Sequence, residues 1–305
     1  MKIHGDGIKV TEQVFLDPNI PVKEAVVSHA HADHGATNSD TIHCTPNTKR
    51  LLEERFEQEN IVPHEFEEPF KIDGCKVTLY PAGHVLGSAM ICVEKENKTW
   101  LYTGDFKLGE DDTTKQAVAV QCDTLITETT FALPIYRWPS PHKEIDKVMS
   151  WYNKNKDNGV ASVLFCYSLG KAQRVLSLLK DRDVKVYCHR TVRDMNKCYE
   201  DAGVDLGDWE YHSLNQDLGT KLFIAPKQVQ KAKAIQKGVR TGFASGWMSI
   251  RGRRTWRGYD AGFTISDHAD WEELCSFVKD CKPKEVKGVH GYVESFEKYC
   301  EEELL

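Results

Sequence analysis

The sequence contains no hydrophobic run that could cross a membrane. Every apolar stretch is shorter than the ~18 residues of a membrane-spanning helix, and the mean hydropathy is −0.50. The first residues, Met1–Asp6, also lack the basic and apolar regions of a signal peptide. These absences exclude a protein with helical membrane spans, and we expect a soluble, cytoplasmic protein.

The sequence also lacks any CxxC pair, although it contains ten cysteines. A thiolate zinc site is therefore disfavoured, and without an export signal a disulfide framework is not expected either. Cys92 and Cys166 lie inside apolar runs, where cysteine behaves as a small hydrophobic residue. The cysteines are thus expected to be reduced and structural.

Charge is unevenly distributed along the 305 residues, a length sufficient for two compact lobes or for one domain with a large insertion. Residues 138–258 contain 22 Lys and Arg against 12 Asp and Glu, giving +10. The rest of the chain contains 18 against 34, giving −16. A basic segment favours a polyanionic substrate, because Lys and Arg neutralise phosphates. A solvated surface of mixed charge is the alternative.

Four potential metal ligands lie within six residues, in the HxHxDH run of His29, His31, Asp33 and His34. Imidazole nitrogens and carboxylate oxygens bind first-row divalent metals, and a run this dense can serve two neighbouring ions. The apolar residues 24–27 before it predict a buried strand whose carboxyl end would present the histidines. The alternative is a group of surface or hydrogen-bonded histidines.

Two further single ligands follow predicted strands. Residues 76–80, 90–94 and 99–103 show strand patterns, the last two facing each other across a turn. His84 lies in a glycine-rich loop after the first strand, and Asp105 follows the third beside Gly104. A rigid backbone can expose a ligand at such positions, and a carboxylate can bridge two metals. A helix is expected over residues 48–55.

From about residue 138 to 258 strands and helices alternate, which predicts a small parallel α/β lobe. Strands are expected at residues 160–167, 184–188, 221–225 and 238–244, and helices at 171–179, 191–199 and 228–236. Ser168, Gly170 and Lys171 link the first strand to its helix, where backbone N–H groups, a hydroxyl and an ammonium group can hold a phosphate. Ser168 acting only as a helix cap is the alternative.

The succession HxHxDH, AGHVLGSA, YTGDF, TETTF, SDHAD and VHG resembles that of metallo-β-lactamase-fold β-CASP nucleases, and the resemblance covers essentially the whole chain. The sequence around FASGWMSIRGRRTW is most similar to that of ligase-associated DNA exonucleases, relatives of the interstrand-crosslink repair nucleases. The resemblance implies an αββα sandwich of residues 1–137 and 259–305, with an inserted compact α/β β-CASP domain at 138–258.

The resemblance also implies the residues of the site. His29, His31, His84 and Asp105 would hold one metal, and Asp33, His34, Asp105 and His290 the other. Two divalent ions, Zn²⁺ or alternatively Mn²⁺, would place a bridging hydroxide to attack the phosphate, with Asp33 among the catalytic residues. Glu128 would orient His268 as an acid or phosphate ligand. The alternative for His268 is a structural position before an Asp270–Glu273 capping box.

Asp17, which follows a short strand, is expected to hold a metal-binding imidazole in the correct tautomer, or alternatively to be a turn residue before Pro18. Substrate contacts are expected from a basic loop whose arginines can pair with phosphates and whose tryptophan can stack on a base. This loop contains Arg251, Arg253, Arg254, Trp256 and Arg257. A flexible basic loop without a partner is the alternative.

The expected function is metal-dependent exonuclease activity on single-stranded DNA or flap ends, 5′ to 3′, in DNA repair, with a DNA ligase and a helicase as partners. A β-CASP RNA nuclease is a second hypothesis, because a histidine at position 290 is typical of the RNA-processing enzymes. The VHGY sequence at residues 289–292 favours the ligase-associated group. A catalytically silent nucleic-acid-binding scaffold is a third hypothesis, although no ligand is missing. A small-molecule hydrolase would need neither the basic segment nor Glu128 and His268.

Overall fold

The structure is a computed structural model that describes all residues except 36–37, 233–234, 236–237 and 251–257. It divides into two compact units. Unit 1 comprises Met1–Tyr136 and His268–Leu305, and unit 2 comprises Arg137–Asp267. The chain therefore leaves unit 1, forms unit 2, and returns.

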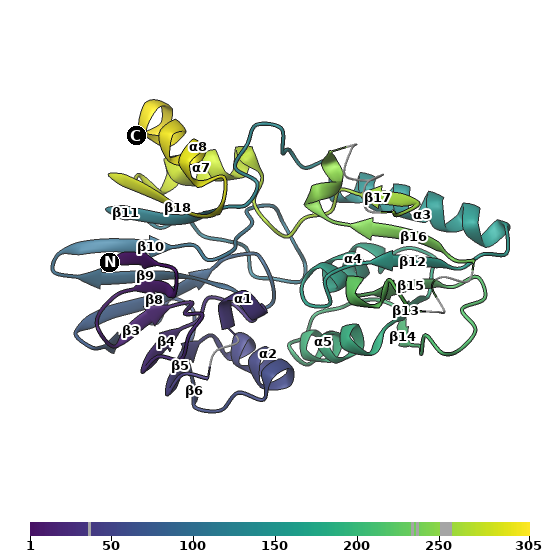
Figure 1. Cartoon of the computed structure of the whole chain (residues 1–305), viewed down its shortest axis with the longest axis horizontal. Coiled ribbons are helices and arrows are strands. Elements are labelled where there is room, and N and C mark those ends of the chain that lie inside the picture. The colour runs from purple at the N-terminus through teal and green to yellow at the C-terminus, as the bar shows by residue number, and fades with distance from the viewer. Residues whose placement is uncertain (36–37, 233–234, 236–237, 251–257) are drawn as a thin grey trace. The chain divides into compact units, whose positions relative to one another are not determined.

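Unit 1 contains two six-stranded sheets (Figure 1). The first sheet has the order β1 (Lys2–His4), β2 (Gly7–Lys9), β3 (Val14–Leu16), β4 (Glu24–Val26), β5 (Thr41–Cys44) and β6 (Ile61–Pro63). The second has the order β18 (Glu285–Gly291), β11 (Thr124–Thr129), β10 (Lys98–Tyr102), β9 (Ala89–Lys95), β8 (Cys75–Pro81) and β7 (Phe70–Ile72). Strands β3 to β6 are parallel, as are β10, β11 and β18.

Apolar side chains of both sheets form one core of unit 1. Val14, Leu16 and Val26 from the first sheet cluster with Val77 and Ile91 from the second. Strands β8 and β9 show little alternation between buried and exposed residues. Both faces of the second sheet are therefore covered at these strands. The predicted α/β sandwich is confirmed.

The helices of unit 1 begin where the sequence supplies caps. In α2 (Pro46–Phe56) the Thr45 side chain accepts a hydrogen bond from the Thr48 N–H at 3.2 Å, with proline in the first position. Helix α7 (Trp271–Cys281) begins with the predicted capping box of Asp270 and Glu273. The apolar faces of α7 and of α8 (Val293–Tyr299) pack on the outer face of the second sheet. The short α1 (Ala32–Gly35) and η3 (Cys300–Leu304) complete the helices described in this unit.

Unit 2 is a parallel α/β sheet, as the alternating pattern predicts. Its strands have the order β14 (Trp209–Tyr211), β13 (Val186–Cys188), β15 (Leu222–Ala225), β12 (Ser162–Phe165), β16 (Arg240–Ala244) and β17 (Ala261–Phe263). All neighbours are parallel. The α-helices described here are α3 (Pro141–Asp157), α4 (Lys171–Leu179) and α5 (Arg190–Asp201), with a short η2 at Gly246–Ser249.

The helix expected over residues 228–236 is wrong for the described positions. A short 3₁₀ helix, η1 (Lys227–Val229), stands there, and the Ala232 and Ile235 N–H groups bond to carbonyls three residues earlier. Ile235 is buried in the core of unit 2. Tertiary burial thus outweighs the helix propensity of the segment.

A search of the described residues for membrane-spanning segments finds no helix with the necessary length and apolar character.

Candidate metal centre

Loops at one end of the strands of unit 1 carry the predicted ligands. His29 and His31 follow β4 directly, and Asp105 follows β10. His84 lies in the loop between β8 and β9, and His290 lies near the end of β18. Since these strands end at the same region of the sandwich, residues far apart in the sequence come together there.

The first cluster contains three imidazoles and one carboxylate. The His31 Nδ1 atom lies 3.0 Å from His29 Nε2 and 3.2 Å from His84 Nε2. Asp105 Oδ2 lies 3.6 Å from both of those Nε2 atoms. Ligands placed tetrahedrally around Zn²⁺ at ordinary bond lengths are about 3.3 Å from one another. The four ligand atoms therefore have the mutual spacing of a divalent-metal site.

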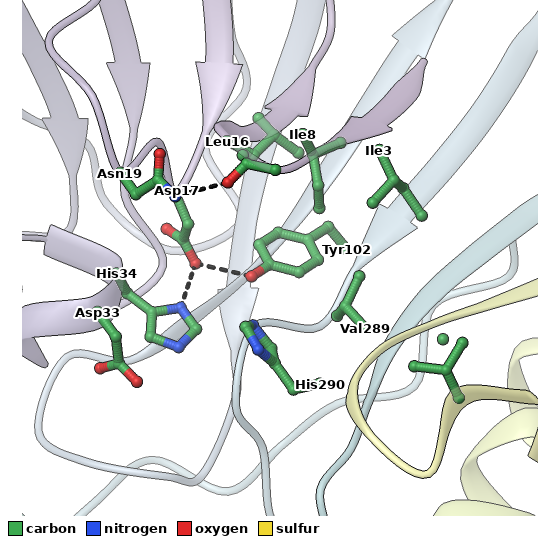
Figure 2. A pocket seen from close by; sticks show the side chains of 14 residues that line it. Ile3, Ile8, Leu16, Asp17, Asn19, Asp33, His34, Tyr102, Val289 and His290 are labelled. Atoms are coloured by element: carbon green, nitrogen blue, oxygen red, sulfur yellow. Dashed lines mark hydrogen bonds and ion pairs between the residues drawn. The ribbon is translucent and has the colours of Figure 1, made fainter.

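The second cluster shares the carboxylate of Asp105. Its Oδ2 atom lies 3.7 Å from His34 Nε2, so one oxygen faces the ligands of both clusters. The rings of His34 and His290 have centroids 5.5 Å apart, and Asp33 lines the same cavity of about 400 Å³. Figure 2 shows Asp33, His34 and His290 at one side of this cavity. A bridging role for Asp105 stays a prediction.

Asp17 connects the two clusters from behind. Its Oδ2 accepts hydrogen bonds from His34 Nδ1 at 2.7 Å and from the Tyr102 hydroxyl at 2.9 Å (Figure 2). It also accepts from the backbone N–H and the hydroxyl of Ser28, whose oxygen lies 2.9 Å from His29 Nδ1. Because these contacts use the Nδ1 atoms, the Nε2 atoms of His29 and His34 are left to face the metal positions. Asp17 therefore contacts the imidazole of His34 as the expected role requires, and that role stays a prediction.

Burial and neighbouring charges shift the pKa values of this centre. Burial lowers the pKa of His34, but the charge of Asp105 and the hydrogen bond with Asp17 outweigh it and raise that pKa to about 10. Burial raises the pKa of Asp105 to about 6, although His34 acts against it. Burial and the neighbouring imidazoles hold the pKa of His29 well below its ordinary range. In the metal-free protein at neutral pH, His34 is therefore protonated and His29 neutral.

Metal binding is consequently expected to release a proton from His34. A metal ligand must be deprotonated, so below pH 10 the apparent affinity of the second site should rise with pH, approaching about tenfold per unit. Isothermal titration of metal-free protein at pH 7.5, in two buffers with different ionisation enthalpies, measures the released protons directly. We expect close to one proton for the ion bound at His34. Heats that do not depend on the buffer would contradict this expectation.

Glu128 and His268 form a pair beside the clusters. His268 Nδ1 lies 2.8 Å from Glu128 Oε2, and its Nε2 lies 4.0 Å from Asp105 Oδ2. The Glu128 carboxylate is buried and also accepts the Phe106 N–H at 2.9 Å. A carboxylate on one imidazole nitrogen leaves the other directed at the reaction centre. The capping box of Asp270 is present as well, and the catalytic role of His268 stays a prediction.

Comparison with known proteins agrees with this geometry. Residues 14–157 match the model of the β-lactamase superfamily domain. The chain is 34% identical over 289 residues to a probable DNA ligase of Opitutus terrae, covering 92% of this chain and 28% of the ligase. It is 26% identical over 298 residues to the DNA cross-link repair protein SNM1 of Arabidopsis thaliana, covering 85% of this chain and 59% of that protein. Residues 14–157 of this chain thus form a β-lactamase-superfamily domain. The resemblance to the β-CASP nucleases is confirmed.

Other relatives of this metallo-β-lactamase-fold chain extend the comparison. It is 29% identical over 197 residues to an RNase J-like protein of Methanocaldococcus jannaschii, covering 54% of this chain and 47% of the relative. A crystal structure of a protein of unknown function from Enterococcus faecalis V583 has a TM-score of 0.60 at 13% identity, covering 87% and 75% of the two chains. That likeness shows the fold alone. The chain spans less than two thirds of each of these three sequence relatives. The metallo-β-lactamase fold implies divalent metal ions, which the cluster of His29, His31, His84 and Asp105 fits.

The predicted phosphate-binding turn lies in unit 2. Gly170 has a φ of 85° and precedes α4, and its N–H donates to Gln173 Oε1 at 2.8 Å. The Lys171 ammonium group is only 2% exposed and is ion-paired with Asp267, while the Ser168 carbonyl accepts from Gln173. A phosphate role for this turn stays a prediction. The loop residues Arg251, Arg253, Arg254, Trp256 and Arg257 lie outside the described residues.

Several residues that build the site were not found from the sequence. Tyr102 and Ser28 hold Asp17, and Lys107 joins the segment after Asp105 to Glu273 of α7. Ser28 stands next to the HxHxDH run and could have been noticed. Tyr102 is one more aromatic residue in a strand, and nothing in its spacing distinguishes it.

His43 and His64 form a separate structural cluster in unit 1. His43 Nδ1 lies 2.8 Å from His64 Nε2, its other nitrogen lies 3.0 Å from Glu24 Oε2, and His64 stacks on Phe70 with centroids 3.5 Å apart. Burial, and then the charge of His43, lowers the pKa of His64 to about 4. His64 is therefore neutral in the folded protein near pH 5.

This cluster should make unit 1 less stable in mild acid. Between the ordinary pKa of 6.5 and about 4, the unfolded chain binds more protons at His64 than the folded chain, so stability falls as pH is lowered through this window. The drop in unfolding temperature from pH 7.5 to pH 5 should be smaller in His64→Gln than in the unmodified protein. The exposed His142→Gln should keep the full drop. Equal drops in all three proteins would contradict the assignment.

Proposed function

We propose that this chain is a metal-dependent DNA exonuclease that hydrolyses phosphodiester bonds of single-stranded or flap DNA, 5′ to 3′, in DNA repair. The observation that carries the proposal is the convergence of two ligand clusters on one oxygen of Asp105, with the Glu128–His268 pair 4.0 Å from that oxygen. Unit 2 is, in this proposal, the β-CASP insertion, and its basic composition would attract the phosphate backbone.

The residues take separate roles in this reaction. His29, His31 and His84 would hold one divalent ion, and Asp33, His34 and His290 the other, with Asp105 between them; Zn²⁺ suits the nitrogen-rich set, and Mn²⁺ is the alternative. Bound ions would supply an activated water and neutralise charge on the phosphate.

The chain's own groups would do the rest. Asp17, directly at His34 and through Ser28 at His29, would keep the Nε2 atoms of both imidazoles available to the ions. His268, held by Glu128, would donate a proton to the leaving oxygen or bind the scissile phosphate.

The names of the relatives support DNA as the substrate. Proteins named DNA cross-link repair protein SNM1 and Artemis, and two proteins named as DNA ligases, contain segments similar to this chain. Since the Opitutus terrae ligase carries such a segment over 28% of its length, a ligase is also the partner that we propose, together with a helicase of the same repair process.

End-labelled single-stranded DNA tests the proposal. Substrates with a 5′-phosphate, a 5′-hydroxyl or a blocked 3′ end are digested in Zn²⁺ and in Mn²⁺, with and without chelator. We expect mononucleotides released from the 5′ end, and a loss of release with chelator and in His31→Ala. Digestion that survives both treatments would refute a metal-dependent nuclease.

An RNA nuclease is the second candidate, and His290 together with relatives named RNase J-like protein and RNase favours it. A matched comparison of DNA and RNA oligonucleotides of one sequence decides, because cleavage of DNA alone would eliminate it. The silent-scaffold hypothesis predicts purified protein without bound metal, which metal analysis of the same sample would reveal.

A further inference from the structure

An ion pair joins the segment after Asp105 to helix α7, which begins three residues after His268. Lys107 is 5% exposed, and its ammonium group lies 3.2 and 3.1 Å from the two carboxylate oxygens of Glu273 in α7. The same carboxylate accepts the Gly109 N–H at 2.7 Å and the Asp270 N–H at 3.0 Å. The capping box explains only the contact of this carboxylate with Asp270. Its contacts with Lys107 and Gly109 hold it to the segment after Asp105.

The backbone around Lys107 contacts the His84 loop as well. The Lys107 N–H donates to the Ala82 carbonyl at 2.9 Å. At Gly83, which has a φ of +72°, an added Cβ would lie 2.3 Å from the Lys107 carbonyl oxygen. The loop that carries His84 therefore packs directly on the backbone of Lys107, with no room for a side chain between them.

The backbone of Phe106 links this segment to Glu128 and to the loop of His268. The Phe106 N–H donates to Glu128 Oε1 at 2.9 Å, and the Phe106 carbonyl accepts the Ala269 N–H at 2.6 Å. Phe106 follows Asp105, and Ala269 follows His268. The segment that ends in Lys107 thus contacts the loops of His84 and His268 and the carboxylate that holds His268.

We infer that Lys107 and Glu273 are positioning residues that fix His84, Asp105 and His268 relative to one another for phosphodiester hydrolysis. The inference rests on the proposed function. An ion pair suits this task, because removing Glu273 takes the counter-charge from the buried Lys107 ammonium group. Removing Lys107 takes away one of the three donors that hold the Glu273 carboxylate between the segment after Asp105 and α7. A displacement of about 1 Å in a reacting group can cost about 10²-fold in rate. Lys107 and Glu273 are not among the predicted metal ligands, so metal binding itself should persist.

Steady-state kinetics on single-stranded DNA test this role. Lys107→Met and Glu273→Gln should each lower kcat about 10- to 100-fold, with KM changed by less than about threefold and two metal ions per chain retained. The double variant should lose no more than either single variant, because both remove one interaction. Lys107→Arg, which keeps the charge, should recover part of the loss. Glu272→Gln, an exposed neighbour in the same helical turn, is the matched control and should behave as the unmodified protein.

Hydrogen exchange of the metal-free protein gives a readout independent of activity. Peptides covering residues 104–109 and 268–274 should both exchange faster in Lys107→Met and in Glu273→Gln, and peptides of unit 2 should not change. An unchanged kcat in the single variants would overturn the inference. So would a fall in kcat that parallels a loss of bound metal, or a fall in the double variant that equals the product of the two single effects. If the unmodified protein cleaves no nucleic acid, the proposed function fails, and coupled exchange of the two loops still decides whether the pair positions them.

Discussion

Replacing Asp105 with alanine is expected to reduce DNA hydrolysis by on the order of 10³-fold, because metal-based charge stabilisation is worth several kcal/mol. One oxygen of Asp105 lies 3.6 to 3.7 Å from the ligand nitrogens of both clusters, so removing this side chain should weaken both sites. The variant should also bind fewer than two ions per chain. Rates of release from labelled DNA and metal analysis of the same sample measure both effects.

The control for this prediction is Asp40→Asn, an exposed carboxylate in the same unit. It should retain both the activity and the two ions. An Asp105→Ala protein that keeps two ions and half of its activity would show that the bridging role is wrong, whatever the fate of the nuclease proposal.

Replacing His268 with alanine is expected to lower the rate on DNA by about 10² to 10⁴-fold, the range for a positioned acid. Its Nε2 atom lies 4.0 Å from Asp105 Oδ2, while its Nδ1 is held by Glu128 at 2.8 Å. Glu128→Gln should act in the same direction, because an amide can no longer favour the protonated imidazole.

The leaving group separates the two roles left open for His268. An acid matters little for an aryl phosphodiester such as bis(p-nitrophenyl) phosphate, whose leaving group needs no proton. If His268 is the acid, His268→Ala should lose far less on this ester than on DNA. Equal losses on both substrates would make His268 a phosphate ligand. No loss on either substrate would contradict the assignment to the reaction.

Local pattern was enough to predict most elements that border the site. The short apolar run before His29 is strand β4, and the helix expected at residues 171–179 is α4 with identical bounds. Each of these elements is indicated by features within a few residues. An apolar, β-branched run indicates the strand, and a glycine precedes the helix. The helix predicted at residues 228–236 is not found at the described positions, where Ile235 is buried in the core of unit 2. This burial is a tertiary contact that the local pattern does not report.

The contacts behind the ligands could not be predicted in the same way. Tyr102 reaches Asp17 across 85 positions, and Lys107 reaches Glu273 across 166. Such pairs arise because strands and helices from distant parts of the chain are packed side by side, and a single sequence contains no spacing that reports it. The ligand motifs predicted where a metal would be held, and the structure adds how its ligands are oriented.

The most direct test of the central claim is a crystal structure of the metal-loaded protein, with anomalous diffraction recorded at the absorption edge of the added metal. The account predicts two ions about 3.5 to 4 Å apart, one within bonding distance of His29, His31 and His84, the other of Asp33, His34 and His290, and Asp105 bound to both. A single ion, or two ions that leave His84 or Asp105 more than ~3 Å away, would contradict it.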